Sequence, residues 1–239
     1  MTVKTDIEHS GHFKSKIVMK AAPRQPTAKR SDRRQVRNRK ALLEATEQLI
    51  ARKGFAALTV DEITAAADLA KGTFYNYFTD KEEIAREAAM LARNEFEARV
   101  SAAHSGLKDP AERYVTGMAV YFRASADEPN RVSVAAQMYG QWLHPEAKGN
   151  ALLRKDLEDC YRSGRFTHCG PPAAVVLTVG IVQAGMTRIM ALADSRAAQS
   201  LALEQCSLAL TALGVRWSEA QAIAARTVAR VFAADWKIK

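Results

Sequence analysis

Apolar residues along most of this chain recur at intervals of three and four, which is the spacing of an amphipathic helix. In the stretch "RKALLEATEQLIARKGF", Leu42, Leu43, Leu49 and Ile50 fall on one face, and Gly54 follows as a natural C-cap. The alternation typical of strands and the Asn-Gly dipeptides typical of hairpins are absent from the sequence. The pattern therefore predicts an all-α fold.

Capping residues indicate where several of these helices begin. A side-chain oxygen followed three residues later by Glu or Gln satisfies the free amides of a first helical turn, and Pro suits its first position. The predicted starts are Thr59 with Glu62, Asp80 with Glu83, Asp109 with Pro110 and Glu112, and Ser218 with Gln221. Further helices are predicted around 172–193 and over 195–214.

The stretch "KGTFYNYF", residues 71–78, has the composition of a short helix that is buried on one side only. Phe74 and Phe78 are four residues apart and share the face that would pack on the preceding helices. Tyr75 and Tyr77 flank that face, so their hydroxyls are free to reach outward. Helix, short helix, turn and short helix together form the plan of a helix-turn-helix, whose second short helix enters the major groove of DNA.

Residues 38–85 closely resemble the DNA-binding domain of the TetR family of bacterial transcriptional regulators. The resemblance lies in Gly54-Phe55 after the first helix, the Thr59-capped second helix, and "KGTFYNYF" followed by Lys81-Glu82. It implies an N-terminal helix-turn-helix domain, placed here at 33–85, and a C-terminal helical domain for ligand binding and dimerisation, placed at 86–239.

The resemblance also implies roles for individual residues. Thr59, Tyr75, Tyr77 and Lys81 would hold DNA phosphates, and Lys71, Gly72, Thr73 and Asn76 would face the groove. Family members often carry a small polar residue where this chain has Leu69 and Ala70, so base recognition would depend more on Thr73 and Asn76.

The basic charge of the protein is concentrated at its N-terminus. Residues 1–40 hold 12 Lys/Arg and three Asp/Glu, a difference of +9. The net charge of all 239 residues is also +9, so the remaining residues sum to zero. We predict that residues 1–32 form a disordered basic arm, and that the arm and the adjoining helix contact DNA. A tail that only improves solubility is the alternative. The predicted contacts are Lys29, Arg30, Arg33, Arg34 and Arg37.

The C-terminal half carries aromatic and methionine residues that suit a cavity for an apolar or aromatic small molecule. The same residues at helical spacing would also fill an ordinary core. Gln183 and Arg188, inside the apolar helix near 172–193, could supply polar contacts. The candidate lining is Met118, Tyr121, Phe122, Met138, Tyr139, Trp142 and Met186.

Sequence motifs of catalysis and of metal binding are absent. The chain has no GxSxG, HExxH, Walker or GxGxxG motif, and Cys160, His168 and Cys169 match no standard zinc spacing. We predict no enzymatic activity, no cofactor and no metal. Three cysteines without a CxxC pair, no secretory apolar run and an apolar helix interrupted by Gln183 and Arg188 predict a cytoplasmic protein that does not span a membrane.

We therefore expect a homodimeric repressor that binds a palindromic operator in double-stranded DNA and is released by a small molecule. One recognition helix covers only a few base pairs, so specificity favours two-fold symmetry. Helices 172–193 and 195–214 would form the dimer interface through Gly180, Ala184, Gly185, Leu203, Leu210 and Leu213. The alternatives are an architectural or division-control DNA-binding protein without an effector, and a thiol-based redox regulator.

Overall fold

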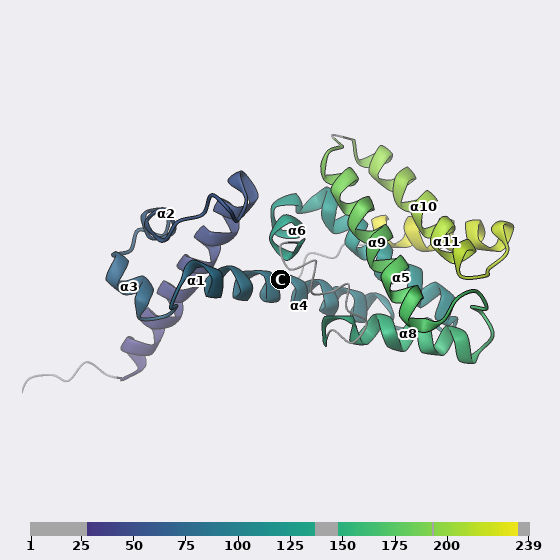
Figure 1. Ribbon diagram of the computed structural model, residues 1–239, viewed down its shortest axis with the longest axis horizontal. Coiled ribbons are helices and arrows are strands. Elements are labelled where there is room, and N and C mark those ends of the chain that lie inside the picture. The colour runs from purple at the N-terminus through teal and green to yellow at the C-terminus, as the bar shows by residue number, and fades with distance from the viewer. Residues whose placement is uncertain (1–27, 137–147, 193, 234–239) are drawn as a thin grey trace, which may run out of the picture.

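The computed structural model describes residues 28–136, 148–192 and 194–233, and within these ranges every regular element is a helix. Figure 1 shows two groups of helices that are joined by α4. The predicted all-α fold is confirmed. The elements in chain order are α1 (Ala28–Lys53), α2 (Val60–Ala66), α3 (Lys71–Tyr75), α4 (Lys81–Ala103), α5 (Pro110–Asp127), α6 (Pro129–Ala136), the 3-10 turn η1 (Lys148–Asn150), α8 (Ala151–Arg162), α9 (Pro171–Met190), α10 (Ser195–Ala212) and α11 (Trp217–Ala233).

The N-terminal group consists of α1, α2, α3 and the beginning of α4, and it has an apolar core of its own. Leu42 of α1, Ile63 of α2 and Phe74 of α3 have no exposed surface. The same core takes in Ala89 of α4 and Val134 of α6. The helix-turn-helix is therefore packed against α6, an element that is distant in the sequence.

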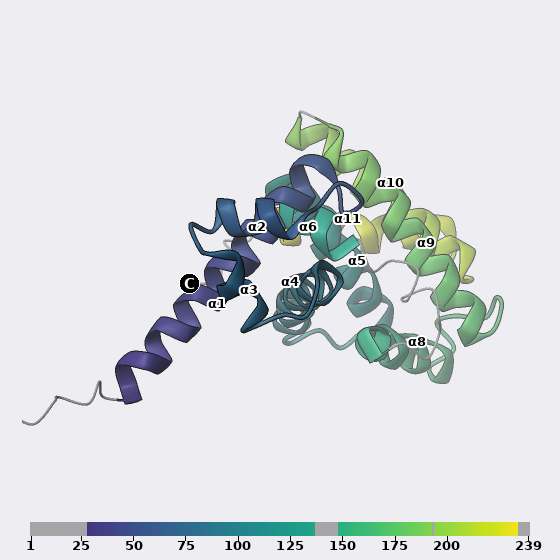
Figure 2. The ribbon, with the colours of Figure 1, turned by 60° about the vertical axis from the view of Figure 1, so that its left-hand side comes forward.

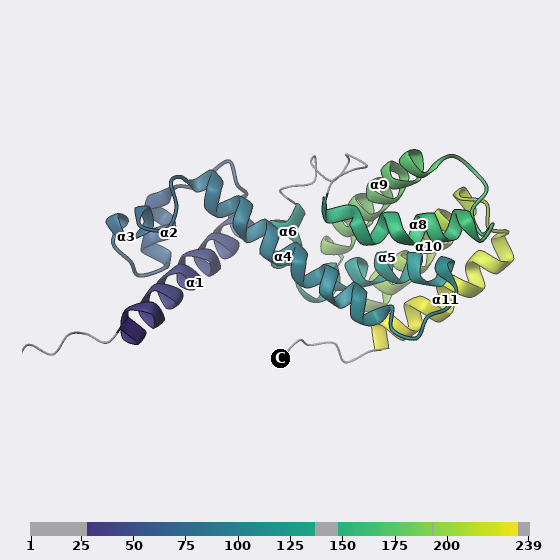
Figure 3. The same cartoon turned by 90° about the horizontal axis from the view of Figure 1, so that it is seen from below.

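Helix α4 belongs to both groups. Ala88 and Ala89 pack in the N-terminal core, whereas Ala92 and Phe96 pack in the C-terminal core. The predicted boundary between 85 and 86 lies within this continuous helix, and the change from one core to the other occurs near residue 90. Figure 3 shows α4 running from the N-terminal group into the C-terminal bundle.

The C-terminal group is a bundle with α5 at its centre. This helix packs against α4, α6, α8, α9, α10 and α11. Its residues Tyr114, Val115 and Phe122 are at most 2% exposed. Burial of large apolar side chains on several sides of one helix is what holds such a bundle together.

Local capping signals give the correct starts for three of the four helices. In each of the three, a backbone amide of the first turn donates to the predicted side chain. These hydrogen bonds are Glu62 N to Thr59 Oγ1 (3.3 Å), Glu83 N to Asp80 Oδ1 (2.7 Å) and Ala111 N to Asp109 Oδ1 (3.0 Å).

The predicted start at Ser218 is wrong. Helix α11 begins at Trp217, and the Ala220 amide donates to the Arg216 carbonyl, so Ser218 lies inside the first turn. The predicted C-cap of α1 is correct, because Gly54 follows Lys53 with a φ of +77°. A glycine tolerates this left-handed conformation, which other residues rarely adopt.

Helix α1 begins earlier than we predicted. Residues 28–32, placed in the disordered arm, are part of the helix, and the predicted domain start at 33 lies within it. Ala, Lys and Arg are strong helix formers, so these positions extend a helix whose nucleus lies further on. Figure 2 shows the first turns of α1 projecting away from the rest of the molecule. Residues 1–27 lie outside the described residues.

The predicted interface residues on α9 and α10 divide into two sets. Leu210 and Leu213 have no exposed surface, and a Cβ on Gly185 would overlap the Phe122 ring. These three residues therefore pack within their own chain, and their assignment to an intermolecular interface is wrong. Ala184 is exposed, and nothing lies within 4 Å of the position that a Cβ on Gly180 would take.

The outer faces of α9 and α10 carry apolar side chains. Val176 on α9 is 47% exposed and Leu208 on α10 is 50% exposed. Among the described residues, α9 is also the one helix long and apolar enough to cross a membrane, although 39% of its most apolar window is buried in the protein. A core or interface helix passes the same test.

Candidate DNA-binding surface and ligand cavity

Two buried aromatic side chains fix α3 on the N-terminal core. Phe74 and Phe78 are 0% and 2% exposed, and their ring centroids are 5.7 Å apart. The Arg39 guanidinium carbon lies 5.4 Å from the centroid of the Phe78 ring and ties α1 to the same anchor. The predicted inward face of this short helix is confirmed.

The opposite face of α3 is open to solvent. Lys71, Gly72, Tyr75 and Asn76 are exposed, while Thr73 and Tyr77 are half-buried. No atom lies within 4 Å of a Cβ built on Gly72, so the backbone there can be approached closely. Helix α3 ends at Tyr75, so Asn76 and Tyr77 lie in the turn that follows it. The geometry gathers these six predicted residues on one short segment.

Three of the predicted DNA contacts have polar partners within the protein. The Lys71 ammonium lies 2.7 Å from Asp61 Oδ1, an interaction that raises the pKa of Lys71. Lys81 Nζ donates to the Leu58 carbonyl at 3.0 Å and lies over the Phe55 ring. The Thr59 hydroxyl donates to the side chain of Glu62. DNA phosphates would compete with these partners.

The N-terminal half of α1 adds basic side chains. Arg33, Arg34 and Arg37 are exposed, whereas Arg39 forms an ion pair with Glu87. The side chains of Lys29 and Arg30 lie outside the described residues. The three exposed arginines lie on α1, which also packs in the N-terminal core, so this helix fixes their positions relative to the helix-turn-helix.

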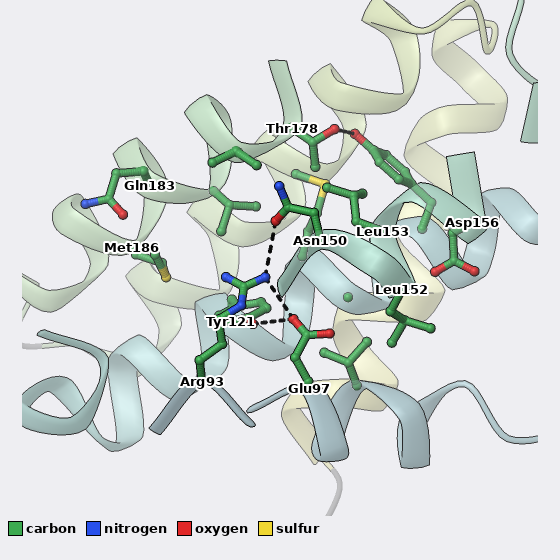
Figure 4. Close-up of a pocket in the computed structure, with 16 residues that line it drawn as sticks. Arg93, Glu97, Tyr121, Asn150, Leu152, Leu153, Asp156, Thr178, Gln183 and Met186 are labelled. Atoms are coloured by element: carbon green, nitrogen blue, oxygen red, sulfur yellow. Dashed lines mark hydrogen bonds and ion pairs between the residues drawn. The ribbon is translucent and has the colours of Figure 1, made fainter. Parts of the chain in front are cut away.

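A cavity lies in the C-terminal bundle between α4, α5, η1, α8 and α9 (Figure 4). The space between its walls, with the open mouth included, is about 650 Å³. Apolar residues make up much of the wall, namely Val100, Met118, Leu152, Leu153, Val179, Val182 and Met186.

Arg93, Glu97 and Tyr121 form a hydrogen-bonded cluster in the cavity wall (Figure 4). Glu97 Oε1 accepts from Tyr121 Oη at 2.7 Å and from Arg93 Nη2 at 3.1 Å. Arg93 Nη2 also donates to the Gly149 carbonyl and lies 3.4 Å from Asn150 Oδ1. Burial raises the pKa of Glu97 and, more strongly, that of Tyr121. The cluster connects α4, α5 and η1.

The predicted cavity residues are only partly brought together. Met118, Tyr121 and Met186 line the cavity, whereas Phe122 is buried beside Gly185 and does not line it. Arg188 is exposed and also lies outside the lining. The remaining predicted positions, Met138, Tyr139 and Trp142, fall outside the described residues.

Sequence reasoning missed the charged part of the wall. Arg93 and Glu97 are spaced i, i+4 on the same helix as the buried Phe96 and Val100. This spacing could have indicated an ion pair next to the apolar face of the helix. Asn150 could not have been found in this way, because only the fold brings it beside α4.

Two of the three cysteines are inaccessible. Cys160 and Cys206 have no exposed surface, and burial raises the pKa of the Cys160 thiol to about 12 and that of Cys206 further. Cys169 is exposed, with its sulfur 3.6 Å from the Tyr161 hydroxyl. The described part of the chain contains no group of three His, Cys, Asp or Glu residues that could hold a metal ion.

Comparison with known proteins identifies the helix-turn-helix segment. Residues 42–88 match the sequence profile of the tetR family of bacterial regulatory proteins. This segment has the sequence of a TetR-family DNA-binding domain. A curated TetR-type relative, the HTH-type transcriptional repressor DhaR of Mycobacterium sp. (strain GP1), is 31% identical over 86 residues. That match spans 36% of this chain and 42% of DhaR.

Solved structures extend the likeness beyond the helix-turn-helix segment. RolR in complex with resorcinol is 26% identical, with a TM-score of 0.56, over 82% of this chain and 96% of RolR. A TetR family transcription regulator from Marinobacter aquaeolei VT8 has a TM-score of 0.60 at 22% identity, over 77% of this chain and 100% of that one. The second likeness concerns the fold alone.

Proposed function

We propose that this protein is a transcriptional regulator, a homodimeric repressor that leaves a palindromic operator when a small molecule enters the cavity. The observation that carries the proposal is that one helix, α4, serves both sites. Ala88 and Ala89 pack in the helix-turn-helix core, and Arg93 and Glu97, one turn further on, line the cavity. A ligand that moves this part of α4 displaces the DNA-binding domain as well.

The face of α3 supplies the DNA contacts in this proposal. Phe74 and Phe78 hold the segment rigidly, while Lys71, Gly72, Thr73 and Asn76 face the major groove. Thr59, Tyr75, Tyr77 and Lys81 contact phosphates on either side, and basic residues of α1 extend the contact. DNA in the bacterial cytoplasm is the partner that this arrangement fits.

Dimerisation follows from the small size of α3 and from the apolar outer faces of α9 and α10. A five-residue helix reads too few base pairs for specific binding, and a two-fold axis doubles the site. Val176, Ala184 and Leu208 are exposed on α9 and α10 and would be covered by the second copy. Leu203, which is half-buried, would lie at the edge of that contact.

The cavity is the proposed effector site. Its apolar wall with a polar cluster in one part suits a small apolar or aromatic molecule that carries a polar group. The likeness to RolR, whose structure was solved with resorcinol, supports an aromatic effector. Burial of two of the three cysteines favours this mode of control over a thiol-based redox switch.

The test is to isolate genomic fragments that the purified protein retains, and to measure their affinity by fluorescence anisotropy with and without candidate small molecules. We expect a few palindromic fragments to bind at nanomolar concentration, one dimer per palindrome by sedimentation. Binding to many unrelated fragments would favour an architectural protein, and a stable monomer at micromolar concentration would contradict the dimer.

A further inference from the structure

We infer that the cavity takes a neutral hydroxylated aromatic molecule, a phenol or diphenol, whose hydroxyls donate hydrogen bonds to Gln183 and Glu97. The inference rests on the proposed function in one respect, namely that the cavity is the effector site. It comes from the balance of hydrogen-bond donors and acceptors in the wall.

The free groups of the wall include acceptors. Gln183 Oε1 is buried and accepts no hydrogen bond. Glu97 receives its two hydrogen bonds on Oε1, so Oε2 has no hydrogen-bond partner among the residues described. A buried acceptor such as Gln183 Oε1 costs about 1–3 kcal/mol when it lacks a donor, so a ligand that donates there gains affinity. Glu97 Oε2 is a second acceptor, on a residue that lines the cavity.

Several donors of the wall already have acceptors. Tyr121 donates to Glu97, and Arg93 donates to Glu97 and to the Gly149 carbonyl. The Thr178 hydroxyl donates to the Ala174 carbonyl at 2.6 Å, so in the 2.8 Å contact between Tyr114 and Thr178 the tyrosine is the donor. A ligand that only accepts hydrogen bonds would have to compete with these partners.

Charge also favours a neutral ligand. A carboxylate in the cavity would lie beside Glu97 and Asp156, both of which line it. An ammonium group would meet the Arg93 guanidinium, which lies 3.1 Å from Glu97. A hydroxyl avoids both repulsions, and at Gln183 it can donate to the amide oxygen and accept from the amide nitrogen.

The rest of the wall suits an aromatic ring. Met118 and Met186 offer polarisable sulfur atoms, which pack well against the edge of a ring. Val179 and Val182 lie on the same helix as Gln183, so a ring lying against them brings a substituent hydroxyl toward the amide.

Calorimetry on the full-length protein without DNA tests the inference separately from DNA binding. The probes are phenol, catechol, resorcinol and hydroquinone, with 1,3-dimethoxybenzene as the analogue without donors, 3-hydroxybenzoate as the anion and benzylamine as the cation. We expect at least one hydroxylated probe to bind ten times more tightly than all three comparison compounds. Equal or tighter binding of the dimethoxy, anionic or cationic compound, or no binding of any hydroxylated probe, overturns the inference.

Variants then locate the contact. Gln183→Leu should weaken binding of the best hydroxylated probe about tenfold, because the acceptor is lost. Gln221→Leu, an exposed substitution on α11, is the matched control and should leave the affinity unchanged. Wild-type affinity in Gln183→Leu overturns the assignment of the hydroxyl to this residue. Failure to retain DNA in the separate assay would contradict the regulator and leave these binding results intact.

Discussion

The guanidinium of Arg131 on α6 lies 3.2 Å from the carboxylate of Glu47 on α1, and its second terminal nitrogen lies 2.5 Å from Glu95 on α4. One side chain thus connects the first helix of the helix-turn-helix domain to both helices that join it to the bundle. Arg131 and Glu47 are 27% and 18% exposed, so the pair is screened less than a surface ion pair.

Replacing Arg131 by Met should therefore weaken the coupling between the two sites. We expect the free energy of unfolding to fall by roughly 1 kcal/mol, somewhat more than for an exposed pair. We also expect the effector to change operator affinity by a smaller factor than in the wild type, measured by anisotropy titrations with and without effector. Arg162→Met, which breaks an exposed pair with Asp159, is the control. An unchanged factor in Arg131→Met would contradict the coupling role.

Two neighbouring residues of the recognition segment should affect DNA binding differently. Asn76→Ala should lower the preference for operator over random DNA by about 1–3 kcal/mol, because a base contact is lost. Tyr77→Phe should weaken binding to both DNAs alike, since a phosphate contact carries no sequence information. The phenylalanine keeps the ring that packs on the N-terminal core. Competition titrations with operator and random DNA measure both effects. If Asn76→Ala lowered the affinity for both DNAs equally, Asn76 would not take part in base recognition.

The basic N-terminus should appear in the salt dependence of DNA binding. Arg33, Arg34 and Arg37 are exposed on α1, so their joint replacement by Gln should flatten the slope of log affinity against log salt. Each lost phosphate contact changes the slope by about 0.9, which gives up to about three units. Deleting residues 1–27 tests the arm separately. Arg162→Gln on α8 serves as the control, and an unchanged slope in both variants would mean that this charge takes no part in binding.

Thiol reactivity should distinguish the three cysteines. Cys169 is exposed, whereas Cys160 and Cys206 are fully buried with raised pKa values. We expect the native protein to release one equivalent of chromophore with a disulfide reagent, and Cys169→Ser to release none until it is unfolded. Loss of operator binding when the wild type is oxidised, together with retained binding in oxidised Cys169→Ser, would revive the redox alternative.

The pair of His104 and Asp156 predicts a pH effect on stability. His104 Nδ1 lies 3.7 Å from Asp156 Oδ2, and burial lowers the pKa of His104 more than the carboxylate restores it. The unfolded chain therefore binds this proton at higher pH than the folded protein, and acidification below about pH 6.5 favours unfolding. Asp156, whose pKa is raised by burial, contributes a slope of opposite sign.

We accordingly expect His104→Gln to lose less stability than the wild type when the pH falls from about 7 to about 5. Urea unfolding at several pH values measures this difference. A loss as large as that of the wild type would show that His104 does not contribute to the pH dependence.

The amino-acid sequence by itself determined the helical class, several helix ends and the recognition segment. The capping contacts of Thr59, Asp80 and Asp109 and the left-handed Gly54 depend on residues only a few positions apart, so the pattern contains all the information they need. Burial of Phe74 and Phe78 follows in the same way from one short helix with a single apolar face.

Only the tertiary structure decided which residues meet across helices. Asn150 lies beside Arg93, which is 57 residues away in the sequence, and Arg131 contacts Glu47, which is 84 residues away. No local periodicity encodes either contact. The same holds for Leu210, Leu213 and Gly185, whose helices are apolar on more than one side, so the pattern did not show which side faces the chain's own core. Phe122 likewise packs beside Gly185 instead of lining the cavity, because the missing side chain leaves space that the ring fills.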